Sequence, residues 1–373
     1  CIYMTYDFIV PCLMGTEGLV ADELKFAGFE NVKSENGRVG FSGDMEACAR
    51  ANIILRCGER VLMRLAGFPA RSFEELFQGV KAIAWEDILG KDDSFPVKGY
   101  CLNSMLHSVP SCQSIIKKAV VERMKASYGV GWLEETGDRY QIQFSIVRDT
   151  AEIFIDTTGD PLYKRGYKQQ SNIATIRETL AASMVKLARY RGRETFIDPF
   201  CGSGTIAIEA AMTSLGIMPG ARRGFDAELW GFYDNRVFAR LKEEYIAKEH
   251  REQLPIFAYD IDPECAAITE ANARRAGVEG CIRVAVGDAL KLDYPSERAV
   301  MITNPPYGQR MMDVEQARRI YTALGHRTAG NNGLKKYIIT SDAEFERFYG
   351  RRADKKRKLY NGMIKCDLYM YFK

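Results

Sequence analysis

The chain has 373 residues, of which 46% are hydrophobic and 27% charged, and this is the composition of a soluble globular protein. No run of about 18 apolar residues occurs, so the sequence predicts no membrane span. The net charge of +3 is uneven, because residues 1–170 carry 20 Lys+Arg against 23 Asp+Glu and the remainder carries 32 against 26. This balance permits a polyanionic partner without requiring one.

Ten cysteines occur singly, with no CxxC pair, and there are only three histidines. A disulfide framework and a metal site are therefore disfavoured, and we expect no metal and a reducing, cytoplasmic environment. The first residues, CIYMTYDFIVP, lack a basic start followed by an apolar core, which also argues against secretion.

The first 160 residues alternate short apolar strands with amphipathic helices, a pattern typical of α+β units. Asn36-Gly37 marks a turn and Asp44 a helix start. A first unit is predicted with strands at residues 6–12 and 38–42 and helices at 16–27 and 44–56. A second unit is predicted with strands at 60–68 and 95–103, helices at 72–88 and 111–128, and a hairpin over 140–156.

The stretch GDPLYKRGYK, residues 159–168, breaks this pattern and predicts a linker over residues 159–170. Beyond it, strands alternate regularly with helices, as expected of a doubly wound parallel sheet. The strands are predicted at residues 195–199, 256–260, 282–286, 299–303 and 336–340. Asn361-Gly362 predicts an antiparallel hairpin near the C-terminus.

A glycine-containing loop, DPFCGSGT (198–205), follows the first strand of this sheet. Gly202 and Gly204 allow a tight turn and close approach to a ligand, and the following helix start supplies free N–H groups. A dinucleotide fingerprint would place a third glycine at position 207, which is alanine. NAD binding and a turn without a ligand are therefore the disfavoured alternatives.

Carboxylates follow the next two strands. Asp260 can accept both hydroxyls of a ribose, and Asp262, which precedes Pro263, is either a second ligand or a helix cap. Asp288, in the triplet Gly-Asp-Ala, could accept the 6-amino group of an adenine. Because open sheets bind ligands at the carboxyl ends of their strands, these residues should line one crevice together with Asp198 and Asn304.

The fourth strand ends in ITNPPYG (302–308). Consecutive prolines fix their own φ and push Asn304 into an extended conformation, so the strand must end in a rigid turn. Such a turn presents carbonyl oxygens, an amide and an aromatic ring. This shape is suited to holding an amino group beside a ring.

The motifs DPFCGSGT, YDIDP, GDA and NPPYG, in this order, resemble those of amino-methyltransferases, which methylate exocyclic amines of adenine or guanine with S-adenosylmethionine. The resemblance implies an α/β, Rossmann-like class I methyltransferase domain that ends in the antiparallel hairpin. It implies cofactor binding by Asp198, Cys201, Gly202, Gly204, Thr205, Asp260, Asp262, Asp288 and Asn304. It also implies that the target base is held for catalysis by Asn304, Pro305 and Tyr307.

The N-terminal half is similar to that of THUMP-containing RNA methyltransferases, and most of all to bacterial enzymes that methylate the 2-amino group of a guanine in large-subunit ribosomal RNA. This resemblance implies a ferredoxin-like unit over residues 1–57, a THUMP RNA-binding domain over 58–160 and a methyltransferase domain over 161–373. Some of these relatives carry a second methyltransferase domain. Since this chain stops at Lys373, no second activity is expected.

Basic residues in three segments are candidate RNA contacts, although charged residues are as often simply solvated. They are Lys164, Arg165 and Lys168, then Arg222 and Arg223 within the stretch 219–225, and Lys355, Lys356, Arg357 and Lys358 just before the last hairpin. The leading hypothesis is guanine 2-amino methylation in 23S ribosomal RNA. The alternatives are adenine 6-amino methylation on DNA or RNA, guanine methylation of transfer RNA, and a non-catalytic ribosome-assembly factor that binds RNA.

Overall fold

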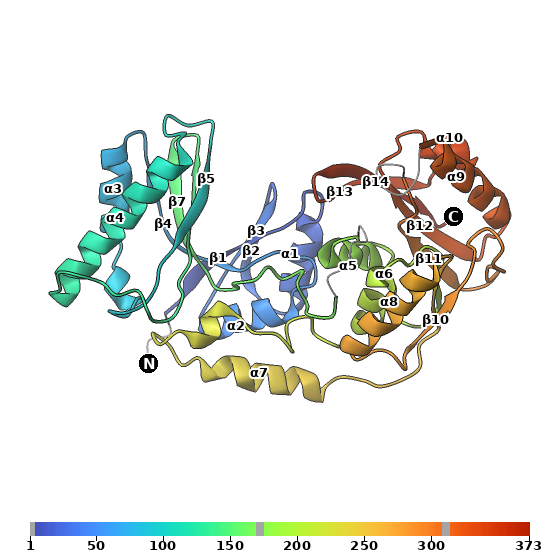
Figure 1. The fold of residues 1–373 in the computed structure, drawn as a ribbon, viewed down its shortest axis with the longest axis horizontal. Coiled ribbons are helices and arrows are strands. Elements are labelled where there is room, and N and C mark those ends of the chain that lie inside the picture. Colours follow the sequence, from blue (N-terminus) through green and yellow to red (C-terminus); the bar gives the residue numbers. More distant parts are fainter. Residues whose placement is uncertain (1–3, 169–174, 308–313) are drawn as a thin grey trace.

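The computed structural model describes residues 4–168, 175–307 and 314–373, and these form two seven-stranded sheets. The molecule is elongated, with the N-terminal half at one end and the C-terminal half at the other (Figure 1). The mixed α/β architecture predicted from the sequence is confirmed. Among the described residues, no helix has both the length and the apolar character needed to cross a bilayer.

The N-terminal sheet has the strand order β2-β3-β1-β4-β7-β6-β5. Its strands are β1 (Tyr6–Pro11), β2 (Glu30–Glu35), β3 (Arg38–Gly43), β4 (Leu62–Pro69), β5 (Val97–Leu102), β6 (Ile142–Val147) and β7 (Thr150–Asp156). Its helices are α1 (Glu17–Phe26), α2 (Met45–Ile54), α3 (Phe73–Lys81), α4 (Val109–Tyr128) and the short η1 (Trp85–Asp87). Because β4 pairs antiparallel with β1 on one side and β7 on the other, the two predicted N-terminal units share one continuous sheet.

Two elements of this half differ from the prediction. Residues Glu30–Glu35 form strand β2, which the sequence analysis missed because almost every residue in it is exposed and no apolar alternation marks it. The helix predicted over 72–88 ends at Lys81, and the η1 turn follows so that the Trp85 side chain can be buried.

The C-terminal sheet has the order β10-β9-β8-β11-β12-β14-β13. Its strands are β8 (Thr195–Asp198), β9 (Ile256–Asp260), β10 (Ile282–Val286), β11 (Ala299–Thr303), β12 (Leu334–Thr340), β13 (Lys355–Asn361) and β14 (Ile364–Tyr371). Its helices are α5 (Glu178–Leu187), α6 (Thr205–Ser214), α7 (Arg236–Ala247), α8 (Pro263–Arg275), α9 (Val314–Thr328), α10 (Phe345–Tyr349) and the short η2 (Asp226–Leu229).

The first five strands of this order are parallel, and β14 and β13 close the sheet as an antiparallel hairpin, as predicted. The basic run is placed differently from the prediction. Lys355 to Lys358 lie within strand β13 and not ahead of the hairpin.

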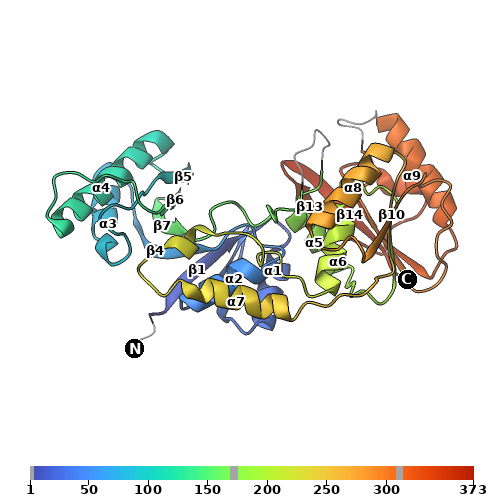
Figure 2. The ribbon, with the colours of Figure 1, turned by 60° about the horizontal axis from the view of Figure 1, so that its bottom comes forward.

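The segment between α6 and β9 connects the two halves of the molecule, and it contains the stretch 219–225 that the sequence analysis offered as a candidate RNA contact. Helix α7 lies alongside α2 of the N-terminal half (Figures 1 and 2). Trp230 stacks on Tyr140 with ring centroids 4.6 Å apart, and its Nε1 donates to the carbonyl oxygen of Arg139 at 2.9 Å. A Cβ atom at Gly220 would lie 2.6 Å from the carbonyl oxygen of Asn52, so that stretch is packed against the end of α2.

Candidate active site

Four neighbouring strands, in the order β10-β9-β8-β11, end at the same edge of the C-terminal sheet. Asp198 ends β8, Asp260 ends β9, and Thr303, the residue before Asn304, ends β11. Asp288 follows β10 after one intervening residue. The structure therefore brings the predicted residues of all four motifs to one corner.

The loop 201–204 is held in shape by hydrogen bonds from two neighbouring elements. The Asp260 carboxylate accepts from the Gly202 N–H at 2.9 Å. From α8, the Thr269 hydroxyl donates to the Gly202 carbonyl oxygen at 2.8 Å, and Asn272 donates to the Ser203 carbonyl oxygen at 2.9 Å. The sequence analysis missed Thr269 and Asn272. They lie in a helix more than 60 residues after the loop, and no sequence motif shows that their side chains face it.

Both glycines of this loop are required by the backbone. Gly202 has φ +54° and Gly204 has φ +82°, which is the left-handed region that glycine enters without strain. A Cβ atom at Gly204 would also lie 2.6 Å from Cγ2 of Thr269. Of the other predicted loop residues, Cys201 and Thr205 are buried, and Thr205 begins helix α6, whose free N–H groups face the loop.

Asp198 is buried and only half satisfied. Its Oδ1 accepts from the Thr303 hydroxyl at 2.6 Å and from the Phe200 N–H at 3.1 Å. Its Oδ2 is buried and has no hydrogen-bond partner among the described residues. Burial raises the pKa of this carboxyl to about 7, against the lowering effect of the Thr303 hydrogen bond.

The other predicted acids are more accessible. Asp260 uses its second oxygen to accept from the Asp262 N–H at 3.0 Å. Asp262 caps α8 by accepting from the Glu264 N–H at 2.9 Å, so the structure supports the alternative role that the sequence suggested for it. Asp288 accepts from the Leu290 N–H at 2.9 Å, and Lys291 lies 3.6 Å from its other oxygen.

The turn after β11 leaves a second acceptor free. Oδ1 of Asn304 is buried and has no partner among the described residues. Tyr321 in α9 donates to the Pro306 carbonyl oxygen at 2.7 Å, and Asn361 at the end of β13 donates to the Tyr307 hydroxyl oxygen at 2.8 Å. Burial raises the pKa of Tyr307, so the phenol stays protonated. Gly308 of this motif lies outside the described residues.

Several predicted RNA contacts are engaged within the protein instead. The side chain of Arg165 is 1% exposed, pairs with Glu209 at 3.2 Å and donates to the carbonyl oxygens of Leu162 and Arg56. A guanidinium that is buried and fully engaged has no surface to offer RNA, so we correct this prediction to a structural role. Lys168 is similarly directed inward, with its Nζ 3.4 Å from Glu178 and 2.6 Å from the Ile176 carbonyl oxygen.

The remaining basic residues differ in availability. Arg222 forms a two-point ion pair with Glu249, and Arg223 donates to the carbonyl oxygens of residues 160, 161 and 164. Lys356 pairs with Glu346, and Arg357 donates to the carbonyl oxygen of Gly15. Four predicted lysines are exposed, namely Lys164, Lys355, Lys356 and Lys358, and of these Lys164 lies 3.2 Å from Asp160.

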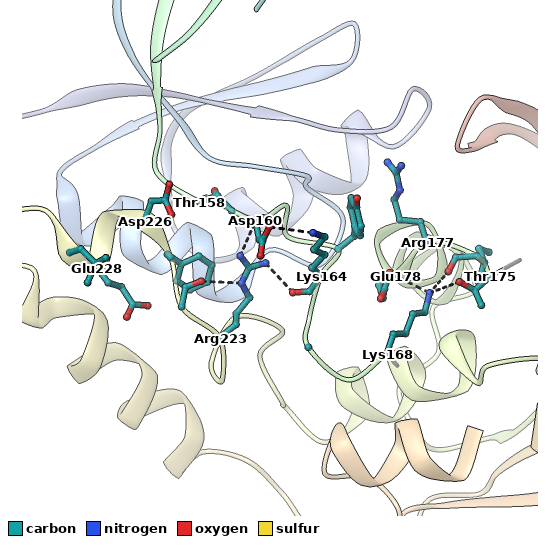
Figure 3. A pocket seen from close by; sticks show the side chains of 16 residues that line it. Thr158, Asp160, Lys164, Lys168, Thr175, Arg177, Glu178, Arg223, Asp226 and Glu228 are labelled. Carbon is teal, nitrogen blue, oxygen red and sulfur yellow. Dashed lines mark hydrogen bonds and ion pairs between the residues drawn. The ribbon is translucent and has the colours of Figure 1, made fainter. Parts of the chain in front are cut away.

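A cavity of about 900 Å³ lies where the linker, the segment between α6 and β9 and the start of α5 meet. Figure 3 shows Arg223 directed at the backbone around Asp160 and Lys164, and Lys168 directed at Thr175 and Glu178. Of the residues that the structure describes, none of the four strand-end side chains lines this cavity. Several of its cations are engaged by its own acids and carbonyl groups, and Oδ2 of Asp226 in its lining is buried without a hydrogen-bond partner among the described residues.

Comparison with known proteins agrees with this geometry. Residues 165–370 match the family described as RMKL-like, methyltransferase domain, residues 7–62 match the RlmL ferredoxin-like domain, and residues 70–156 match the THUMP domain. YpsC of Bacillus subtilis (strain 168), whose name makes it a candidate RNA methyltransferase, is 40% identical over 98% of this chain and 96% of its own. Ribosomal RNA large subunit methyltransferase K/L of Psychromonas ingrahamii is 33% identical over 98% of this chain. The chain covers 50% of the length of that relative.

Solved structures give the same picture. SMU.472, a candidate methyltransferase crystallised with S-adenosylhomocysteine, has a TM-score of 0.94 and 38% identity over 99% of this chain and 98% of its own. A Listeria monocytogenes protein, whose title predicts an N6-adenine-specific DNA methylase, has a TM-score of 0.93 and 39% identity over 99% and 96%. The family match, the 40% identity to YpsC and the four motifs that meet at the carboxyl ends of the strands lead to one conclusion. This chain belongs to the RMKL-like methyltransferase family.

Proposed function

We propose that this protein transfers a methyl group from S-adenosylmethionine to the exocyclic 2-amino group of a guanine in RNA, most specifically in large-subunit ribosomal RNA. The observation that carries this proposal is the unpartnered, buried Oδ1 of Asn304 at the end of β11, one strand away from the glycine loop. The THUMP match and the name of the K/L relative support RNA as the substrate. The SMU.472 complex supports the donor.

The residues at the strand ends fit this donor. The buried Oδ2 of Asp198 lacks a partner and would accept from the ammonium of its methionine part, beside the N–H groups of Gly202 and Gly204. Asp260 would accept from the ribose hydroxyls and Asp288 from the adenine amino group. When bound, the donor supplies an electrophilic methyl group on a sulfonium.

The turn after β11 would orient the acceptor. An exocyclic amine is a poor nucleophile because its lone pair is delocalised into the ring. Asn304 Oδ1 and the Pro305 carbonyl oxygen would accept hydrogen bonds from the two N–H groups of the amine. These hydrogen bonds would direct its lone pair at the methyl group. The new C–N bond would form as the C–S bond of the donor breaks and S-adenosylhomocysteine leaves, and the amine's proton would pass to water, directly or relayed by Asn304 Oδ1. Tyr307 would stack on the base, a contact worth about 1–3 kcal/mol.

The RNA has to present this base outside its helical stack, as for other enzymes that modify bases. We propose that residues 58–160 act as the RNA-binding domain and that the exposed Lys164, Lys355 and Lys358 contact phosphates. Adenine is the second candidate for the target base, because the same turn can hold a 6-amino group and the Listeria relative is titled for that chemistry.

One experiment separates these candidates. Purified protein is incubated with labelled S-adenosylmethionine and with ribosomal RNA, transfer RNA or DNA from a strain that lacks the gene, and the nucleosides are analysed by mass spectrometry. The proposal expects 2-methylguanosine in large-subunit ribosomal RNA. A 6-methyladenosine product would select the adenine alternative. RNA binding without any methylated nucleoside would leave the non-catalytic assembly factor.

A further inference from the structure

Tyr307 is held by a residue from the far end of the chain. The Nδ2 of Asn361, the last residue of β13, donates to the Tyr307 hydroxyl oxygen at 2.8 Å. Both side chains are only partly buried, so this hydrogen bond lies near the surface, beside the turn that follows β11. The two residues are 54 positions apart in the sequence, and the turn signal Asn361-Gly362 gives no indication of a contact with Tyr307.

The strand that carries Asn361 is itself firmly placed. Asn361 pairs with Ile364 across the hairpin, and the Leu359 side chain is fully buried. On its other side, β13 meets the N-terminal half, where Arg357 donates to the Gly15 carbonyl oxygen at 2.9 Å (Figure 1). A Cβ atom at Gly15 would lie 2.5 Å from the Lys358 carbonyl oxygen, so the two backbones are in direct contact.

We propose that Asn361 is a positioning residue that fixes the ring of Tyr307 as a ready platform for the target base. This inference rests on the proposed function, since it needs Tyr307 to stack on the substrate. A half-exposed tyrosine otherwise samples several rotamers, and ordering it on binding costs affinity. A ring that is already fixed avoids this cost for the bound substrate and the transition state alike, so its loss should appear in KM and leave kcat unchanged.

A double-mutant cycle tests this directly. Asn361→Leu removes the donor at similar volume, and Tyr307→Phe removes the same hydrogen bond without touching the hairpin. Each should raise the KM for RNA about 3- to 10-fold, the range expected for one immobilised side chain, with kcat and the affinity for S-adenosylhomocysteine unchanged. Because both changes delete one interaction, the double variant should match either single variant.

Asn332→Leu is the matched control, because it makes the same change at an exposed residue. Asn332 lies in the loop ahead of β12, at the amino-terminal ends of the parallel strands and so at the opposite end from the candidate active site. If Asn361 merely stabilised the hairpin, Asn361→Leu would lower Tm and add its effect to that of Tyr307→Phe. Additive effects, or an unchanged KM in both single variants, would overturn the inference. If Asn361→Leu does not fold, Tyr307→Phe decides alone. Failure of the proposed function is distinguishable, since the wild-type protein would then form no 2-methylguanosine in ribosomal RNA, whatever the state of Asn361.

Discussion

The strand-end corner and the joint between the two halves, which is formed by Arg56, Arg165, Tyr167 and Glu209, both contain buried polar groups, but the acidic side chains of the two regions are satisfied to different degrees. At the joint, Glu209 is fully buried and accepts from both Arg165 and Tyr167. At the corner, one oxygen of Asp198 and one of Asn304 are buried without a partner among the described residues. Buried polar groups are normally satisfied, so two unsatisfied acceptor oxygens on neighbouring strand ends are consistent with a ligand there, although Arg56 Nη1 at the joint also lacks a partner among the described residues.

The comparison also shows that charge alone is a poor guide to function here. The basic and aromatic stretch 159–168 had the composition of an RNA contact, yet its arginine and tyrosine point inward and fasten the linker to α6. The strand-end corner is lined by the acids Asp198, Asp260 and Asp288 and keeps free acceptors. What distinguishes the two regions is that the carboxylate oxygens of Glu209 are satisfied and those of Asp198 are only half satisfied, which the sequence does not display.

The largest effect should come from breaking the joint. Arg165→Ala leaves the carboxylate of Glu209 buried without its cation, so we expect a loss of about 3–5 kcal/mol in the free energy of unfolding. Denaturant titration measures this loss. The matched double variant, Arg165→Met with Glu209→Leu, removes both charges and should recover part of it. Equal stability of the single variant and the wild type would mean that the joint is not the structural element we describe.

Breaking the corner should affect chemistry and leave folding intact. Asn304→Ala removes the acceptor that orients the amine, and we expect the rate of methyl transfer to fall about 100- to 1000-fold, as for loss of one transition-state hydrogen-bonding group. Tm and the affinity for S-adenosylhomocysteine should stay within error of the wild type. Single-turnover assays with saturating RNA measure the step. A variant that keeps its full rate would show that another group orients the amine.

Replacing Asp198 should sharpen the contrast between the two regions. Its buried carboxylate lowers the free energy of unfolding, whereas the ion pair at the joint raises it. The pKa of Asp198 rises on folding from 3.8 to about 7, so stability falls as pH rises through that window. Asp198→Asn should therefore be more stable than the wild type at pH 8, by about 1–2 kcal/mol, and equally stable near pH 4. Thermal unfolding at both pH values checks this.

The same carboxylate predicts a pH dependence of donor binding. If Asp198 accepts from the donor's ammonium, affinity for S-adenosylhomocysteine in the wild type should fall as pH drops through about 7, since the carboxyl then becomes protonated. Asp198→Asn should bind weakly at every pH. Calorimetric titration measures both. A flat pH profile in the wild type would separate Asp198 from the donor.

The smallest effects should come from exposed charge. Lys355→Ala and Lys358→Ala should leave Tm unchanged and weaken RNA binding about two- to fivefold at low salt, with the salt dependence of binding reduced by about one counterion each. Arg222→Ala is the comparison, because its guanidinium already pairs with Glu249. Filter binding over a range of salt concentrations measures these slopes. Equal slopes for all variants would place the RNA elsewhere.

The sequence predicted the corner well and the joint poorly, for one physical reason. Each strand-end motif is local, since a strand, a turn and a helix start lie within about ten residues, and parallel strands bring such ends together. The partners of Asp198 and Tyr307, namely Thr303 and Asn361, come from other strands. The continuity of the N-terminal sheet through β4 and the inward turn of Arg165 depend on packing between distant segments, for which a single sequence carries no local signal.

The most direct test of the account is a crystal structure with S-adenosylhomocysteine. We expect its ribose hydroxyls at Asp260, its adenine toward Asp288 and its sulfur facing Asn304, all at the carboxyl ends of β8 to β11. If the molecule instead occupied the 900 Å³ cavity beside Arg223, away from those strand ends, the assignment of the corner as the site of methyl transfer would be contradicted.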